Sequence, residues 1–244
     1  MSVTPRPQKV ALIVAKRLVD DIYGAGKSPG DRLPPERMML EHYGVGRGTL
    51  REALRFLELQ GVLTLKPGPG GGPIVQKPDA TYLANGLLLL LQFNGAPFSM
   101  IVEARGDLEP IMARHAATQM TPDALRLLGR SVDDMRENLA DREIFLATNK
   151  EFHELIAAGS GNAMYGFLID ALVDIVDGTR MGVDYPEQRR KAILSAHERI
   201  FARLEEHDGD RSFAAMTEHM NQFVSYMQRQ YPDVLDRTVT WDIL

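Results

Sequence analysis

The sequence contains no cysteine, so this chain of 244 residues can form neither disulfide bonds nor thiolate metal sites. That absence fits a reducing cytosolic compartment and restricts any metal site to His, Asp, Glu or Asn ligands. Long apolar runs are also missing, because the longest, residues 87–91, falls far short of the ~20 residues that a membrane-spanning helix needs. The amino end lacks the apolar core of a signal peptide. We therefore expect a cytoplasmic protein with no membrane partner.

Aromatic residues are scarce, with a single Trp and 7% aromatics in total. Any core must therefore consist mainly of Leu, Ile, Val, Met and Ala. No period of about 20 to 50 residues repeats, which argues against a solenoid. With 44% hydrophobic and 25% charged residues, the chain has an ordinary globular composition. Its length allows one large domain or two smaller ones.

The net charge of −5 is unevenly distributed along the chain. Residues 1–78 carry 12 Lys and Arg against 7 Asp and Glu, whereas residues 79–244 carry 16 against 26. A basic segment on an acidic body suggests that only the first third meets a polyanion, although chance unevenness is an equal alternative on charge alone.

The first third of the chain has the order of elements of a winged helix-turn-helix. Apolar residues recur at helical spacing in three short segments, and Gly44 separates the second from the third. Two β-type runs flank a stretch rich in Gly and Pro and predict a hairpin that forms the wing. The predicted helices cover residues 10–23, 35–43 and 48–60, and the predicted strands cover 62–65 and 74–75.

Long amphipathic patterns dominate beyond a composition break near residue 78. They predict helices near residues 80–93, 98–118, 122–139, 142–158, 163–180, 187–207 and 210–230. The predicted fold is therefore mainly α, with an N-terminal winged helix-turn-helix and a C-terminal all-α bundle of six or seven helices. The expected divisions are residues 1–77 for the winged domain, 78–97 for a linker and connecting helix, 98–232 for the bundle and 233–244 for a C-terminal tail.

Polar residues cluster at the start of the third predicted helix. Arg47, Thr49 and Arg51 lie on the side opposite the apolar residues, where a recognition helix enters a groove of DNA. The guanidinium of Arg can bind the edge of guanine or a phosphate. Gly46 and Gly48 keep this end of the helix slim, so the backbone can approach DNA closely. For the isolated helix, a solvated face with ordinary surface arginines is the simpler interpretation.

Two stretches favour DNA binding through a resemblance. Residues 30–37, Gly-Asp-Arg-Leu-Pro-Pro-Glu-Arg, and residues 44–54, Gly-Val-Gly-Arg-Gly-Thr-Leu-Arg-Glu-Ala-Leu, resemble the GntR family of bacterial regulators. The resemblance covers roughly residues 8–76. It implies double-stranded DNA as a partner and the DNA-contacting residues Arg37, Arg47, Thr49 and Arg51, with Gly68 in the wing.

This segment departs from the family pattern at the recognition helix and the wing. Family members usually carry Ser or Thr at the position of Gly46 and often a polar residue at that of Gly48. The wing is longer and richer in Gly and Pro than is usual. Base preference and the wing contact are therefore expected to differ from those of relatives.

The second part resembles the FCD ligand-binding domain of the FadR-like branch. The resemblance is carried by residues 101–110, 149–162 and 196–200, followed by His219. It implies a helical bundle, usually a homodimer, that binds a small organic acid. Such a dimer is expected to recognise a short inverted repeat.

The resemblance also implies a divalent metal ion, with zinc or nickel as the expected ions. Its ligands would be Asn149, His153, His197 and His219, and Asn149 and His153 are four residues apart on one helix face. The family has an aspartate where Asn149 stands, so the site loses one negative charge and metal affinity should be weaker. A metal-free polar pocket is the alternative.

Arg105 is expected to bind the acidic effector, because family members use an arginine here and a guanidinium can pair with a carboxylate. A salt bridge from Arg105 to Glu103 or Glu109 is an equal alternative. The other histidines, His42, His115 and His207, match no ligand position and are expected to be structural. Gly161 and Asn162 are expected to form a turn and a helix cap.

The sequence thus predicts a ligand-responsive transcriptional regulator, with repression as the expected mode. A dedicated metal sensor is one alternative. A metal-dependent hydrolase is a remote one, because neither a nucleophile elbow nor a phosphate-binding loop accompanies the histidines. We therefore expect no enzymatic activity.

Overall fold

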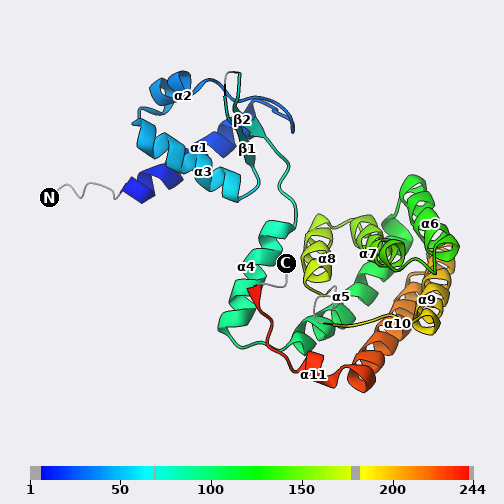
Figure 1. Cartoon of the computed structure of the whole chain (residues 1–244). Helices are drawn as coiled ribbons and strands as arrows, with labels where there is room; N and C mark the ends of the chain where they lie inside the picture. The colour runs from blue at the N-terminus through cyan, green and yellow to red at the C-terminus, as the bar shows by residue number, and fades with distance from the viewer. Residues whose placement is uncertain (1–6, 69, 177–181, 242–244) are drawn as a thin grey trace. The chain divides into compact units, whose positions relative to one another are not determined.

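The computed structural model describes residues 7–68, 70–176 and 182–241, and Figure 1 shows its elements. The chain forms two compact units, Met1–Tyr82 and Leu83–Leu244. The division falls at residue 82, whereas the composition break predicts the end of the first domain at residue 77. Each unit has its own hydrophobic core.

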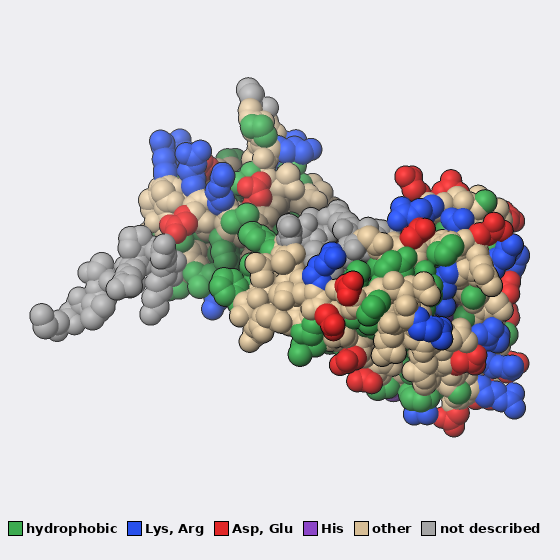
Figure 2. Space-filling view, turned by 60° about the horizontal axis from the view of Figure 1, so that its bottom comes forward, with side chains coloured by type: hydrophobic (Ala, Val, Ile, Leu, Met, Phe, Trp, Pro, Cys, Tyr) green, Lys and Arg blue, Asp and Glu red, His purple; other side chains and the backbone are tan. Residues whose placement is uncertain are grey.

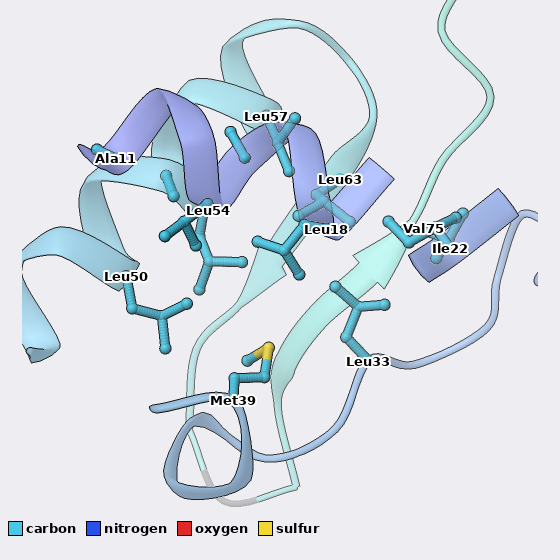
Figure 3. Close-up of a cluster of buried hydrophobic side chains, with 13 residues drawn as sticks. Ala11, Leu18, Ile22, Leu33, Met39, Leu50, Leu54, Leu57, Leu63 and Val75 are labelled. Carbon is cyan, nitrogen blue, oxygen red and sulfur yellow. The ribbon is translucent and has the colours of Figure 1, made fainter. Parts of the chain in front are cut away.

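The first unit is a winged helix-turn-helix. Its helices pack around Leu18, Leu50 and Leu63, which are among its most deeply buried side chains (Figure 3). The two strands pair antiparallel, with Leu63 opposite Val75. The elements are α1 (Pro7–Gly24), α2 (Glu36–Tyr43), α3 (Arg47–Leu59), β1 (Leu63–Lys66) and β2 (Gly72–Val75).

Gly44 makes the turn between α2 and α3. Its φ of 62° lies in the left-handed region, and its N–H donates to the carbonyl of Leu40 at 3.0 Å, which ends α2. A glycine adopts this conformation without the steric cost that a side chain would add. A hydrogen bond of 2.6 Å from the Tyr43 hydroxyl to Asp21 ties the end of α2 to α1. The turn thereby sets the direction in which α3 begins.

The second unit is a helical bundle, as its amphipathic patterns predict. Helix α5 packs along α10, and α6 packs against both α7 and α9. None of the helices in the described part of the chain combines the length and the apolar character that a bilayer crossing requires. The helices are α4 (Thr81–Phe93), α5 (Phe98–Gln119), α6 (Pro122–Glu137), α7 (Arg142–Gly159), α8 (Ala163–Val176), α9 (Glu187–Glu205), α10 (Gly209–Gln230) and α11 (Pro232–Leu235).

The helix predicted over 163–180 is described only to Val176, and residues 177–180 lie outside the described residues. At the carboxyl end, the expected tail contains the short helix α11 and a β-bridge from Thr238 to Pro97. The backbone N–H of Trp241 also donates to Gln92 at 2.8 Å. These contacts bring residues 238–241 onto α4 and the start of α5, which the sequence pattern did not predict.

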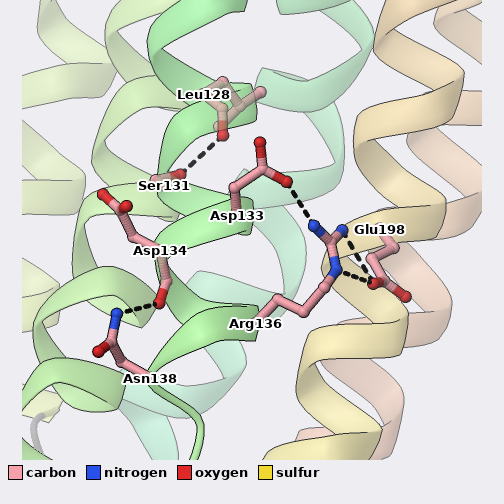
Figure 4. Close-up of polar contacts among 7 residues, drawn as sticks. All are labelled: Leu128, Ser131, Asp133, Asp134, Arg136, Asn138 and Glu198. Atoms are coloured by element: carbon pink, nitrogen blue, oxygen red, sulfur yellow. Dashed lines mark hydrogen bonds and ion pairs between the residues drawn. The ribbon is translucent and has the colours of Figure 1, made fainter.

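Capping and ionic contacts fix the helices that carry the candidate site. Asp141 accepts hydrogen bonds from the first backbone N–H groups of α7, including that of Glu143 at 2.9 Å. Between α6 and α9, Arg136 donates to Glu198 at 3.1 Å (Figure 4). Glu198 directly follows His197, so this contact joins α9 to α6 right beside a predicted metal ligand.

Candidate functional site

The recognition helix α3 has a buried face and a cationic face. Leu50 and Ala53 have no exposed surface, whereas Arg47 and Arg51 are exposed and Thr49 is half-buried. Figure 2 shows Lys and Arg side chains gathered on the visible face of the first unit, while charges of both signs are interspersed on the second. The helix can therefore pack through one face and offer its arginines to a polyanion with the other.

The other two predicted DNA contacts also lie on the surface of the first unit. The Arg37 side chain is 90% exposed, and Glu41, at 3.4 Å, is its one ion-pair partner among the described residues. An exposed ion pair of this kind is weak, so a phosphate can compete for the guanidinium. Gly68 is exposed in the wing at a φ of 89°, while the neighbouring residue 69 lies outside the described part. The roles of these residues in DNA binding stay predictions.

The second unit brings three histidines together from three helices. His153 lies on α7, His197 on α9 and His219 on α10, and their candidate ligand nitrogens all lie within 4.8 Å of one another. All three side chains are buried. The ring of His197 stacks on Phe152, with centroids 3.8 Å apart, which fixes the plane of the imidazole and thus the plane in which its two nitrogens bind a ligand. The sequence placed these three residues together correctly.

Burial keeps two of these imidazoles neutral. It lowers the pKa of His197 well below its usual value, and the nearby His219 and His153 lower it further. Burial also lowers the pKa of His219, an effect that the charge of Glu109 only partly opposes. A neutral imidazole has the lone pair that a metal ion needs.

The histidine cluster fits a divalent cation. Both ring nitrogens of His197 are buried without a hydrogen-bond partner among the described residues. An unpartnered buried polar atom is costly, and a metal ion bound by one of these nitrogens would remove part of that cost. Asn149 is half-buried one turn before His153 on α7, and its role as a ligand stays a prediction.

Arg105 forms the ion pair with Glu109 that was one of its two expected roles, and its role in effector binding stays a prediction. Its Nε lies 2.5 Å from the Oε1 atom of Glu109, and both side chains are buried. The other oxygen of Glu109 contacts Nδ1 of His153. Burial alone would raise the pKa of Glu109, but Arg105 and His153 outweigh it and hold this pKa far below its usual range. The contact of Glu109 with a predicted metal ligand was missed, and only its spacing of four residues from Arg105 hinted at a shared face.

The remaining histidines lie away from this cluster. His42 pairs with Asp21 at 3.3 Å, His115 lies beside the ring of Tyr165, and Nδ1 of His207 is 2.9 Å from the carbonyl of Ala117. Gly161 has a φ of 78°, and the Asn162 side chain accepts a hydrogen bond from the backbone of Met164 at the start of α8. Gly161 and Asn162 therefore form the expected turn and cap.

Both units match known families. Residues 11–71 match the family described as bacterial regulatory proteins, gntR family, and residues 100–222 match the FCD domain. The HTH-type transcriptional repressor NanR of Cronobacter sakazakii is 26% identical over 219 residues, which is 88% of this chain and 84% of that protein. The HTH-type transcriptional regulator YcbG of Bacillus subtilis is 28% identical over 89% of each chain. The solved structure of a GntR protein from Streptococcus agalactiae superposes with a TM-score of 0.73 at 25% identity, covering 88% of this chain and 99% of its own.

Proposed function

Because the chain belongs to the gntR family of bacterial regulatory proteins and carries an FCD domain, we propose that this transcriptional regulator is a cytoplasmic repressor controlled by a small carboxylic acid. The observation that carries the ligand-binding part is the buried cluster of His153, His197 and His219. A core that served stability alone would gain more from apolar side chains than from imidazoles whose nitrogens lack partners. The similarity to repressors named NanR supports repression as the mode of action.

On the DNA side, a homodimer reads a short inverted repeat in double-stranded DNA. The positions of Arg47, Thr49 and Arg51 at the start of α3 support base contacts in the major groove, and Arg37 and Gly68 add contacts outside it. A twofold dimer presents two such helices, which matches the symmetry of an inverted repeat. Arginine contacts to phosphates make the affinity fall steeply with salt.

On the ligand side, we propose a divalent metal, zinc or nickel, bound by His153, His197 and His219 with Asn149 as a further oxygen ligand. Once bound, such an ion supplies a Lewis-acidic position that accepts a carboxylate oxygen. The protein's own part is to hold three neutral imidazoles in place, and the contact of His153 Nδ1 with Glu109 leaves its other nitrogen for the ion. This proposal has two competing forms. In one the acid site works without metal, and in the other the metal ion itself is the signal.

DNA fragments selected from the genome of the source organism, labelled with a fluorophore, test the proposal. We expect affinity for a selected inverted repeat to fall with rising salt and to fall further when an acid of the right class is added. Dialysis of the protein against a chelator distinguishes a metal-assisted acid site from a metal sensor. Loss of the acid response without loss of DNA binding supports a metal-assisted acid site, whereas release of DNA by metal removal alone supports a metal sensor. No salt-sensitive affinity for any fragment would overturn the assignment of DNA binding.

A further inference from the structure

Arg189, in the first turn of α9, is a half-buried cation for which no ion pair is seen among the described residues. Its Nε and Nη2 atoms are inaccessible and have no hydrogen-bond partner among the described residues. Its Cζ lies 4.6 Å from the centroid of the Tyr226 ring on α10. Among the described residues, the other groups that act on its charge are Tyr185 and Arg229, and neither supplies a negative charge at neutral pH. Burial therefore lowers the pKa of Arg189, an effect that a carboxylate would reverse.

Such an arrangement is unfavourable unless a ligand completes it. A guanidinium has five N–H donors and cannot lose its charge at physiological pH, so a buried one without partners carries a desolvation cost. The other arginines of the second unit whose contacts have been described, such as Arg136 and Arg105, each reach a carboxylate. Stacking on Tyr226 holds the guanidinium of Arg189 in position but leaves the donors on Nε and Nη2 unused.

Arg189 belongs to the same part of the bundle as the histidine cluster. It precedes His197 by eight residues on α9, and Tyr226 follows His219 by seven on α10. These spacings are close to two helical turns, or about 10 Å along each axis. The charge of Arg189 is one of those that lower the pKa of His219, so its field reaches the cluster. A small molecule held at the histidines thus lies within the field of this cation.

Arg105, which is buried, and Arg189, which is half-buried, differ in charge balance. Arg105 is neutralised by Glu109, which also contacts His153. Among the described residues Arg189 has no such neighbour, so it supplies positive charge near the histidines where the effector is proposed to bind.

We infer that Arg189, rather than Arg105, is the residue that receives a carboxylate of the effector. The inference rests on the proposed acid-binding function and narrows it. The ligand carries an anionic group that is held by the planar fork of Arg189 on the Tyr226 ring, in addition to any group held at the histidines. Without bound acid, the guanidinium of Arg189 has a desolvation cost that no partner offsets. The acid-free wild type is therefore less stable than a variant with an uncharged side chain at residue 189.

The test uses the full-length protein with succinate, D-gluconate and L-lactate as probes, one each for a dicarboxylate, a sugar acid and a hydroxy acid. Thermal unfolding and release of operator DNA are followed in the wild type, Arg189→Gln, Arg189→Lys and Arg105→Gln. Arg203→Gln is the matched control, because Arg203 lies on the same helix but is partly exposed and pairs with Glu206. For the acid that stabilises the wild type, we expect Arg189→Gln to raise the dissociation constant more than about tenfold. Arg189→Lys should recover part of the affinity, and Arg203→Gln should have no effect.

The measurement without acid separates ligand binding from a structural role. We expect Arg189→Gln to unfold at the same temperature as the wild type or a higher one. A clearly lower unfolding temperature, or a response to acid equal to that of the wild type, would overturn the assignment of Arg189 while leaving the proposed function intact. If the wild type binds DNA but responds to none of the acids, the acid-binding part of the proposed function fails and this inference fails with it.

Discussion

The Nε atom of Arg105 lies 2.5 Å from the Oε1 atom of Glu109, one turn further along α5, and both side chains are buried. Glu109 uses its second oxygen to contact His153. One carboxylate therefore compensates a buried guanidinium and orients a predicted metal ligand. The pair links the charge balance of the bundle to the histidine cluster, and this link has consequences for stability and for metal affinity.

Replacing Glu109 with Gln should destabilise the protein strongly. The change leaves the Arg105 guanidinium buried without its counterion, and breaking a buried ion pair from one side costs about 3–5 kcal/mol. Denaturant unfolding measures the free energy of unfolding. Glu103→Gln is the matched control, because Glu103 is an exposed carboxylate on the same helix. Equal, small effects of both substitutions would show that the Glu109 pair contributes little.

Replacing Asn149 with Asp should strengthen metal binding. A carboxylate adds one negative charge and a stronger ligand next to three neutral imidazoles, so we expect affinity for zinc or nickel to rise by about tenfold or more. Isothermal titration of chelator-treated protein measures the change. His197→Gln should remove most of the affinity, whereas His115→Gln, which changes an exposed histidine outside the cluster, should leave it unaltered. Unchanged affinity in Asn149→Asp would show that residue 149 does not reach the ion.

The stability of the metal-free protein should fall as the pH drops below about 6.5. His197 and His219 have pKa values lowered by burial, so they stay neutral in the folded state and take up protons on unfolding. Each such group makes the free energy of unfolding decrease by up to about 1.4 kcal/mol per pH unit below its unfolded pKa. Glu109 has a lowered pKa in the folded state, so its contribution to the free energy of unfolding is lost only below the usual glutamate pKa of about 4.3. Between pH 5 and 6.5 the slope therefore comes from the histidines rather than from Glu109.

Urea unfolding at several pH values between 5 and 7.5 measures this slope. A variant with both His197→Gln and His219→Gln should show a smaller slope over the same window. A slope that is unchanged in this variant would assign the pH dependence to other groups.

The fold was predictable to the extent that periodicity and turn residues determine it. Gly44 marked the turn of the helix-turn-helix, and the apolar stripes marked the bundle helices. Short elements were missed, because a helix such as Pro232–Leu235 has too few residues to show a period. The same limit applies to Thr238, whose pairing with Pro97 depends on contacts between distant parts of the chain.

For the candidate site, the sequence predicted which residues take part but not which side chains pair with one another. The resemblance identified His153, His197 and His219, and the structure brings them together. It gave no means of choosing between the two roles of Arg105, because the choice depends on where the carboxylate of Glu109 lies in three dimensions. Arg189 was missed because an arginine in the first turn of a helix looks like a surface residue until the burial of its Nε and Nη2 atoms is known.

Arg47→Ala and Arg51→Ala should each weaken operator binding without changing stability. Both side chains are exposed and no ion pair with either is seen among the described residues, so removing them leaves the core of the first unit intact. Loss of a base contact costs about 1–3 kcal/mol, and loss of a phosphate contact reduces the dependence of affinity on salt. Fluorescence anisotropy with a selected operator measures both effects, and Arg126→Ala in the second unit is the control. Full affinity in both variants would remove α3 from the DNA interface.

Two glycines at the helix-turn-helix allow stability and DNA approach to be tested separately. Gly48 lies in the first turn of α3, and a Cβ there would meet no atom within 4 Å. Gly48→Ala should therefore stabilise the free protein by about 0.5–1 kcal/mol, since alanine loses less backbone entropy in a helix. If the slim end of α3 lets its backbone approach DNA closely, the same methyl group should weaken operator binding.

Gly44→Ala is the matched comparison, because Gly44 is equally open but has a φ of 62°. This substitution should destabilise the free protein by more than about 0.5 kcal/mol, because alanine is strained in the left-handed region. Thermal unfolding and operator titration give the unfolding temperature and the operator affinity of each variant. Higher stability with lower affinity in Gly48→Ala supports close approach of the α3 backbone to DNA. Higher stability with unchanged affinity would show that the glycine at residue 48 is not needed for contact, and that the arginines on either side reach the duplex from a greater distance.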